Sequence, residues 1–102
     1  MVKSRKRKIR NQKYVYEYLL NHPCIDCGEI DPIVLEFDHI KGQKIESVSK
    51  MIAQRTSISK IEKEIDKCKV RCANCHKRKT AKEQGWYKYK EIKKLDKLNE
   101  KK

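Results

Sequence analysis

LEFDHI at residues 35–40 and CANCH at residues 72–76 are separated by 31 residues. The first alternates apolar and polar side chains, as a half-buried β-strand does, and the strand should finish near Asp38 and His39. The second places His76 directly after a Cys-x2-Cys pair. A carboxylate and an imidazole can hold a divalent ion, and a neighbouring histidine can take a proton from water beside it. These two stretches therefore predict a metal site next to a general base.

Positive charge is concentrated at the two ends of the chain, whose 102 residues carry a formal net charge of +13. Residues 1–13 hold seven Lys or Arg and no acid, residues 14–76 hold nine basic and ten acidic side chains, and residues 77–102 hold eleven basic and four acidic ones. A nearly neutral centre between two basic arms is typical of a nucleic-acid-binding protein, so a phosphodiester is the expected substrate. The alternative is that the arms only keep the chain soluble.

The hydrophobic fraction of 37% predicts one small domain that needs a metal or disulfide staple. No apolar run approaches the ~20 residues that span a membrane, and the basic N-terminus lacks the apolar stretch of a secretory signal. We therefore expect a cytoplasmic protein with no membrane contact, whose five cysteines are reduced and free to bind metal.

The cysteine pairs Cys24-x2-Cys27 and Cys72-x2-Cys75 have the spacing of a four-thiolate structural zinc site. Because 44 residues lie between the pairs, the ion would tie the two halves of the chain together. Disulfides or a redox pair are the alternatives, and so is a ligand set in which His76 replaces one cysteine.

Hydrophobic periodicity and turn signals divide the rest of the chain into short elements. Cys68 should be buried behind the second strand, and Gly85 should stop a helix. In chain order, we expect an amphipathic helix through residues 14–19 that ends at His22 and Pro23, a strand over 33–37, helices over 48–54 and 58–67 with Ser57 as N-cap of the second, a short strand over 68–71, a helix over 74–83 and a helical tail from Trp86.

The stretch 22–80 resembles the HNH endonuclease family, in particular the small bacterial and phage-type proteins whose zinc is held by two CxxC pairs. The resemblance lies in HPCIDCGEIDPIVLEFDHI, VSKMI and EIDKCKVRCANCHKRKT, which combine Cys-x2-Cys, Asp-His and Cys-x2-Cys-His in the family's order. It implies an α+β fold with a ββα-metal (His-Me finger) core, flanking helices and a structural zinc. The first strand would end at Asp38 and His39, the second would span 68–72, and the helix would start near Asn74.

The same resemblance implies a mechanism. Asp38 and His76 would hold a catalytic Mg2+ or Mn2+ ion, with Ni2+, Co2+ or Zn2+ as alternatives, and His39 would be the general base. The family's middle asparagine, which orients the loop carrying the base, is missing from the EIDKC stretch before the second CxxC pair. Asn74, Lys67 or the backbone would have to take its part.

Contacts to DNA are expected from the basic residues of the N-terminal arm and from those that follow His76. They are Arg5, Lys6, Arg7, Lys8, Lys77, Arg78 and Lys79, with Arg71 and Lys41 as weaker candidates. For the aromatic side chains at positions 14, 16, 18, 86, 87 and 89, core packing or docking of the tail is favoured over stacking on bases. His22 is expected to be structural.

The chain would thus comprise a basic N-terminal arm (1–13), an HNH nuclease domain with a structural zinc (14–84) and a basic, helical C-terminal tail (85–102). Its expected function is that of a metal-dependent DNA endonuclease that hydrolyses phosphodiester bonds, by nicking or by double-strand cleavage. It would act as a monomer or dimer, alongside other phage or mobile-element proteins. The alternative is a non-catalytic, zinc-stapled protein that only binds nucleic acid. A third hypothesis, an adaptor for an acidic protein, predicts binding that is indifferent to competing DNA.

Overall fold

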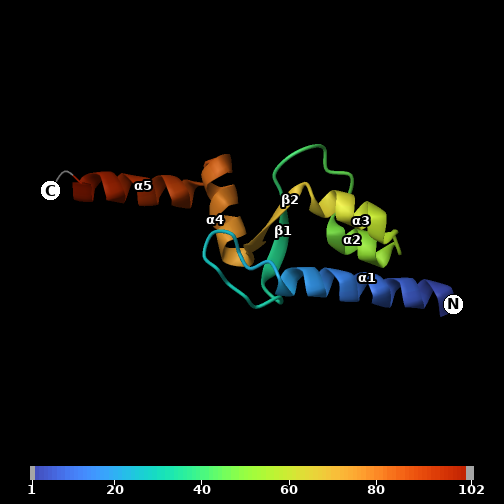
Figure 1. Cartoon of the computed structure of the whole chain (residues 1–102). Coiled ribbons are helices and arrows are strands. Elements are labelled where there is room, and N and C mark those ends of the chain that lie inside the picture. Colours follow the sequence, from blue (N-terminus) through green and yellow to red (C-terminus); the bar gives the residue numbers. More distant parts are fainter. Residues whose placement is uncertain (1, 101–102) are drawn as a thin grey trace.

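The computed structural model describes residues 2–100 and the side chains of residues 5–97. Met1, Lys101 and Lys102, which belong to the expected basic arms, lie outside the described residues. In chain order the elements are α1 (Val2–Leu20), β1 (Leu35–His39), α2 (Val48–Ala53), α3 (Ile58–Ile65), β2 (Cys68–Cys72), α4 (Ala73–Gln84) and α5 (Tyr87–Glu100), as Figure 1 shows.

The strands β1 and β2 form an antiparallel pair in which Leu35 faces Cys72 and His39 faces Cys68. Leu35 is buried while Glu36 is exposed, which confirms the alternation that the sequence predicted for β1. α4 begins immediately after β2 and packs against both strands. The fold is therefore α+β, as predicted, and its central unit is two antiparallel strands followed by a helix.

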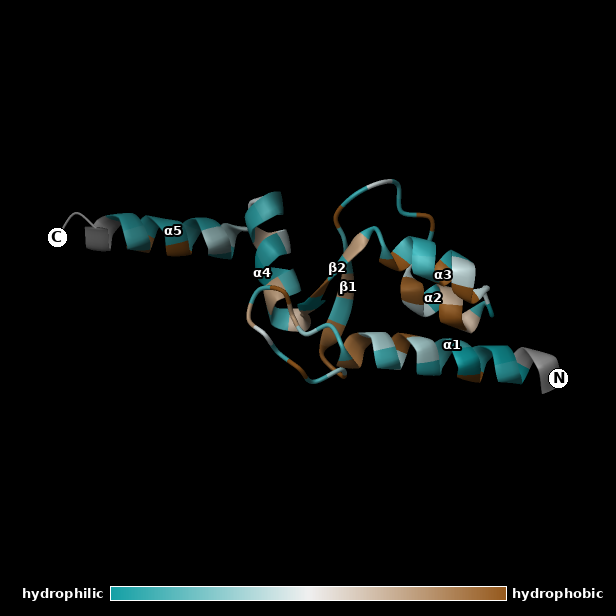
Figure 2. Ribbon diagram, in the orientation of Figure 1, coloured by the Kyte–Doolittle hydropathy of each residue, from teal (hydrophilic) through white to brown (hydrophobic). Residues whose placement is uncertain are grey.

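The core lies where α2, α3 and the C-terminal end of α1 meet the strands. Ile61 on α3 is completely buried, and it belongs to one apolar cluster with Val15, Met51 and Val70. Figure 2 shows hydrophobic residues gathered in this region, whereas α5 and the N-terminal end of α1 are mostly hydrophilic. The Ser57 side chain accepts a hydrogen bond from the backbone N–H of Lys60, which confirms Ser57 as the N-cap of α3.

The expected N-terminal arm and the amphipathic stretch after it form one continuous helix. Asn11, which the sequence assigned to the arm, is completely buried and donates from Nδ2 to the carbonyl of Thr56 at 2.9 Å. Residue 13, the expected boundary, therefore lies inside one helix, and the side chains of Arg5 to Arg10 before it are exposed. By donating this hydrogen bond to the Thr56 carbonyl, Asn11 anchors α1 to the turn that connects α2 and α3.

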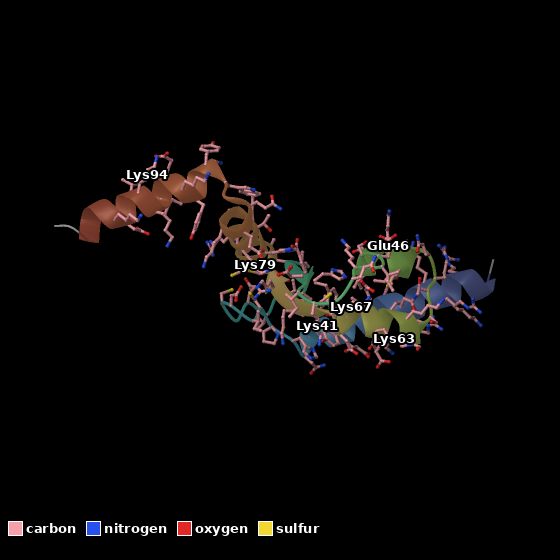
Figure 3. All side chains as sticks on the ribbon, turned by 90° about the horizontal axis from the view of Figure 1, so that it is seen from above. Lys41, Glu46, Lys63, Lys67, Lys79 and Lys94 are labelled. Carbon is pink, nitrogen blue, oxygen red and sulfur yellow. The ribbon has the colours of Figure 1, made fainter. Side chains whose placement is uncertain are left out.

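The tail projects away from the rest of the molecule. Gly85 ends α4 in the left-handed conformation, at φ +63°, as the sequence predicted. α5 then runs outward, and Lys94 on it lies far from the side chains of the core (Figures 1 and 3). Trp86 is 36% exposed and Tyr87 73% exposed. α5 is therefore helical as expected, and it extends away from the core instead of docking on it.

The molecule is elongated, with principal extents of 65 × 26 × 20 Å and a radius of gyration of 17.5 Å. A compact chain of this length would have a radius near ~13 Å. Within residues 2–100, no helix combines the length and the apolar character that crossing a bilayer requires.

Candidate metal centre and paired histidines

Four cysteine sulfurs meet at one point between the two halves of the chain. Cys24 and Cys27 lie in the loop after α1, while Cys72 ends β2 and caps α4. With Cys75, in the first turn of α4, they bring four sulfurs within 4.8 Å of one another, and the Cys27 and Cys72 sulfurs are 3.7 Å apart. A tetrahedral zinc ion with Zn–S bonds of about 2.3 Å separates its sulfurs by ~3.8 Å. The cluster could therefore hold a metal ion such as zinc.

Backbone N–H groups favour the thiolate form of Cys24. Gly28, at φ +79°, turns the chain so that its N–H bonds to the Cys24 carbonyl at 2.9 Å. Burial alone would raise the pKa of Cys24, but N–H groups of Cys72 and Cys27 lower that pKa to about 6. Hydrogen bonding to the Cys72 thiol instead raises the pKa of Cys75 to about 12. A cation among the sulfurs is what would let all of them ionise together.

The fifth cysteine and the first histidine lie apart from this cluster. Cys68 is half-buried, its sulfur donates to the Glu64 carbonyl at 3.4 Å, and burial raises the pKa of its thiol to about 11. His22 stacks on Tyr18, and its Nδ1 lies 2.7 Å from the Tyr18 carbonyl, so it is structural as expected.

His76 connects α4 to β1 through both nitrogens of its ring. Its Nδ1 is 2.8 Å from Glu36 Oε1, while its Nε2 is 3.4 Å from Asp38 Oδ1. Glu36 and Asp38 are two positions apart on β1, so their side chains leave the same face of the strand. Donation from Nδ1–H to the Glu36 carboxylate fixes one tautomer and leaves the lone pair of Nε2 directed at Asp38. These bonds engage His76 outside the cysteine cluster, so it does not replace a cysteine there.

Asp38 Oδ1 and Nε2 of a neutral His76 are two acceptors that face one another. An octahedral ion with bonds of about 2.1 Å places neighbouring ligands ~3.0 Å apart, which is close to the 3.4 Å found here. The pair could supply two ligands to a divalent ion. Among the side chains of residues 5–97, no third Cys, His or carboxylate completes a cluster of three with them.

The second oxygen of Asp38 is held by two cations. Oδ2 lies 2.7 Å from Arg71 Nη1 and 2.8 Å from Lys79 Nζ, and the carboxylate is 9% exposed. Burial alone would raise the pKa of Asp38, but the cationic Lys79 and Arg71, together with His76 in its protonated form, lower it below its usual value. Asp38 is therefore ionised at neutral pH and directs one free oxygen toward His76.

His39 is held by a buried carboxylate on α3. Its Nε2 lies 2.7 Å from Glu64 Oε2, and the Glu64 side chain is only 1% exposed. Glu64 also accepts from the backbone N–H of Ile45 at 3.2 Å and pairs with Lys67 at 3.0 Å. Burial alone would raise the pKa of Glu64, but Lys67, His39 and Ile45 lower it. An ionised carboxylate can only accept, so His39 donates from Nε2 and keeps the lone pair of Nδ1.

The two histidines line one cavity of about 360 Å³, although 36 residues separate them in the chain. Glu36 and Lys44 line it too, and its apolar walls come from α1, α2 and β1. Residues expected to supply the base and one metal ligand are therefore brought together, with Asp38 in contact with His76.

Asn74, the expected replacement for the family's asparagine, is not brought to His39. It is exposed on α4 and lines a different groove, so its expected catalytic role is not supported by its position. Lys67 reaches His39 only through Glu64, and its Nζ also donates to the carbonyl of Gln43 at 2.8 Å.

The residues expected to contact DNA lie on two helices. On α1, Arg5 and its basic neighbours up to residue 8 are exposed, and on α4 so are Lys77 and Arg78. Lys79 is partly buried because it pairs with Asp38 and, at 3.2 Å, with Glu83.

Sequence reasoning missed the two carboxylates that hold the histidines. Glu64 had a visible signal, since it shares the apolar face of α3 with Ile61 and Ile65, where a charged side chain needs a partner. Glu36 also had one, because it shares a strand face with Asp38.

No family model, curated protein or solved structure matches this chain. A function for it is therefore inferred from its own residues and their geometry. The strongest constraints are the four-sulfur cluster and the two histidines with their carboxylates.

Proposed function

We propose that this chain is a metal-dependent nuclease that hydrolyses phosphodiester bonds in DNA, of the HNH type that its sequence resembles. The observation that carries the proposal is a pair of histidines at one cavity, each with one ring nitrogen held by its own carboxylate. His39 is held by Glu64, and His76 by Glu36. A protein that only binds nucleic acid does not need two imidazole rings oriented so that one can accept a proton and the other can bind a metal ion.

His39 would be the general base. Because Nε2 donates to Glu64, Nδ1 is left to take a proton from the attacking water. The buried carboxylate would then stabilise the imidazolium that forms. Glu64 acts on the reaction only through His39, so it is a positioning residue.

Asp38 and His76 would hold the catalytic ion, with the Glu36 carboxylate orienting the His76 ring. When bound, that ion supplies stabilisation of the negative charge that develops on the phosphate and on the leaving oxygen. Lys79 would hold the scissile phosphate, since its amine lies at Asp38 and its side chain is 29% exposed.

The two remaining features fit the same proposal. Zinc at the four cysteines would fix the end of β2 and the start of α4, which carry Arg71 and His76. The basic N-terminal part of α1 would add phosphate contacts that do not depend on base sequence.

Nicking of supercoiled plasmid with Mg2+ or Mn2+ tests the proposal. The rate of nicking by the parent is compared with that by His39→Ala at equal zinc content. His22→Ala is the matched control, because the His22 ring stacks on Tyr18 and bonds to its carbonyl, and it does not line the cavity that holds His39 and His76. We expect open-circle or linear product with the parent and with His22→Ala, and a loss of at least about 100-fold with His39→Ala. Equal activity of all three proteins, or none in the parent, would contradict the proposal.

A second function is a zinc-stapled module that binds nucleic acid without cleaving it. The observation in its favour is that Arg71 and Lys79 already neutralise Asp38, as in a purely structural ion-pair network. It predicts a gel-mobility shift of plasmid that stays intact with every metal tested.

A further inference from the structure

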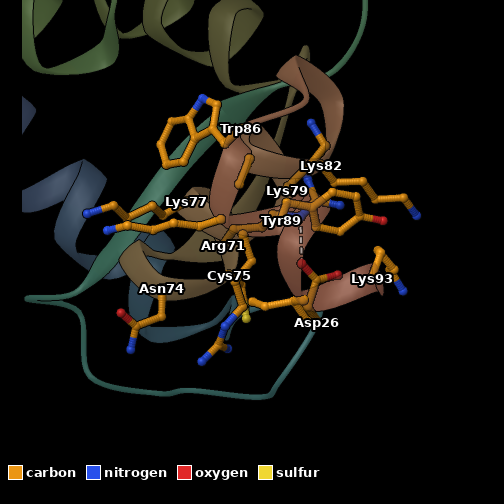
Figure 4. Close-up of a pocket in the computed structure, with 14 residues that line it drawn as sticks. Asp26, Arg71, Asn74, Cys75, Lys77, Lys79, Lys82, Trp86, Tyr89 and Lys93 are labelled. Carbon is orange, nitrogen blue, oxygen red and sulfur yellow. Dashed lines mark hydrogen bonds and ion pairs between the residues drawn. The ribbon is translucent and has the colours of Figure 1, made fainter. Parts of the chain in front are cut away.

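We infer that the groove between α4 and α5 binds a single strand of nucleic acid, by stacking unpaired bases on Trp86 and Tyr89. The groove has a volume of about 750 Å³, which lies within the ~300–1,000 Å³ typical of ligand sites. Figure 4 shows that Trp86 and Tyr89 come from the start of the tail, while Lys77 and Lys82 come from α4.

Charge in the groove selects a polyanion. Seven of its fourteen lining residues are Lys or Arg, and its single acid, Asp26, is paired with Arg71 at 2.7 Å. Lys77, Lys82 and Lys88 make no ion pair with any acidic side chain in the described part of the chain. Their amines are therefore available to phosphates.

The aromatic side chains select unpaired bases over a duplex. Trp86 is 36% exposed and Tyr89 is partly exposed, and with Ile92 and the methylene stems of the lysines they give the groove an apolar lining. In duplex DNA the base faces are stacked on one another, so a protein ring reaches them only in a single strand. An acidic peptide would match the charge but would leave these rings without a partner.

The groove adjoins the site of the proposed nuclease. Arg71 and Lys79 line it and both contact Asp38 Oδ2. A strand in the groove would therefore pass beside the scissile phosphate. If the proposed function holds, the substrate class is DNA with a single-stranded stretch next to the cleaved bond, and this part of the inference rests on that proposal.

Trp86 fluorescence reports directly on binding in the groove, because Trp86 is the single tryptophan of the chain. The zinc-loaded full chain, with no Mg2+ or Mn2+ added, is titrated with a single-stranded DNA of roughly 16 nucleotides and with a blunt duplex of the same sequence. We expect the single strand to quench Trp86 emission and to bind more tightly than the duplex.

Trp86→Ala and Tyr89→Ala are compared by fluorescence anisotropy of the labelled single strand, with Tyr87→Ala as the matched control. Tyr87 is a 73% exposed aromatic on the same helix that does not line the groove. Trp86→Ala or Tyr89→Ala should weaken single-strand binding about tenfold and leave duplex binding unchanged, and Tyr87→Ala should change neither. Circular dichroism and zinc content of each variant show whether it is folded.

Several outcomes would overturn the inference: no change in Trp86 emission, equal loss in the Tyr87→Ala control, or displacement of the DNA by polyglutamate at lower concentration than by a second oligonucleotide. Because none of these measurements involves cleavage, they are separate from the plasmid assay. Nicking without a Trp86 response would reject the groove and keep the nuclease, and the reverse pattern would reject the nuclease and keep the groove.

Discussion

Glu64 is a carboxylate that is 1% exposed and touches three donors. His39, Lys67 and the backbone N–H of Ile45 offset the cost of removing its charge from water. An apolar side chain at that place in α3 would pack in the core without needing any of these partners.

Glu64→Gln should reduce plasmid nicking by about 10–100-fold, because glutamine keeps the shape of the side chain but cannot stabilise a charged imidazole. The loss should fall on kcat, with KM for DNA unchanged, which a merely structural role would not produce. Glu62→Gln is the control, since Glu62 is exposed on the same helix. Equal effects of the two variants would show that Glu64 does not position the base.

The lowered pKa of Glu64 also predicts a pH-dependent contribution to stability. Its folded pKa lies below the ordinary value of 4.5, so the ionised form stabilises the folded state at neutral pH. That contribution is lost as the pH falls from about 4.5 through the folded pKa. The free energy of unfolding of the parent, minus that of Glu64→Gln, should therefore shrink as urea unfolding is repeated from pH 7 down to about pH 3.5.

Release of zinc in acid affects both proteins in that comparison, so their difference isolates the Glu64 carboxyl. A difference that stays constant over the pH range would mean that the folded pKa of Glu64 is not lowered.

The loop after α1 and the start of α4 depend on each other through the cysteine cluster. The backbone N–H of Ile25 also donates to the Val70 carbonyl at 2.9 Å, which adds the loop to the edge of β2. These segments have few other apolar contacts: Ile30 is 75% and Ile33 is 89% exposed. The ordering of the loop therefore depends largely on the cluster.

Cys72→Ala should abolish stoichiometric zinc binding and cooperative unfolding, whereas Cys68→Ala should keep both. Cys68 is the matched control because it lies outside the cluster at the other end of the same strand. Zinc per chain is measured by elemental analysis, and unfolding by circular dichroism with and without a strong chelator. Full zinc content in Cys72→Ala would contradict the assignment of the cluster.

The elements that the sequence predicted well have local causes. α3 begins at its Ser57 cap and α4 stops at Gly85, because both signals act within one turn of helix. The convergence of the four cysteines was also predictable from their paired spacing. Glu64 stood out on the apolar face of α3 and Glu36 on the strand face of Asp38, but neither pattern names the histidine that each one contacts, because those contacts join different elements. α1 was predicted too short because the burial of Asn11 depends on Thr56, 45 residues away.

The whole molecule carries its basic helices at opposite ends. α1 and α5 extend in opposite directions from the central unit (Figure 1), and the molecule is 65 Å long. At 3.4 Å per base pair, this length matches ~19 base pairs of duplex. A duplex bound along this length would be held mainly by phosphate contacts.

Replacing Arg5, Lys6, Arg7 and Lys8 by glutamine should make duplex binding less sensitive to salt. Each phosphate contact contributes about 0.9 to the slope of log K against log salt concentration, so the slope should decrease by up to ~3.6. The slope is measured from the fluorescence anisotropy of a labelled duplex at salt concentrations between about 50 and 200 mM. As a control, the exposed Lys60 and Lys63 on α3 are replaced in the same way. A slope that both sets of changes alter equally would mean that α1 is no special contact surface.

The 44 residues between the two cysteine pairs also set an order of events during synthesis. At ~5–20 residues per second, the ribosome takes roughly 2–9 s to add them after Cys27. Until Cys72 and Cys75 have been added, the chain holds only two of the four thiols that the ion would need. The protein therefore passes through a period in which oxidation of the first two thiols competes with capture of the metal by the complete set.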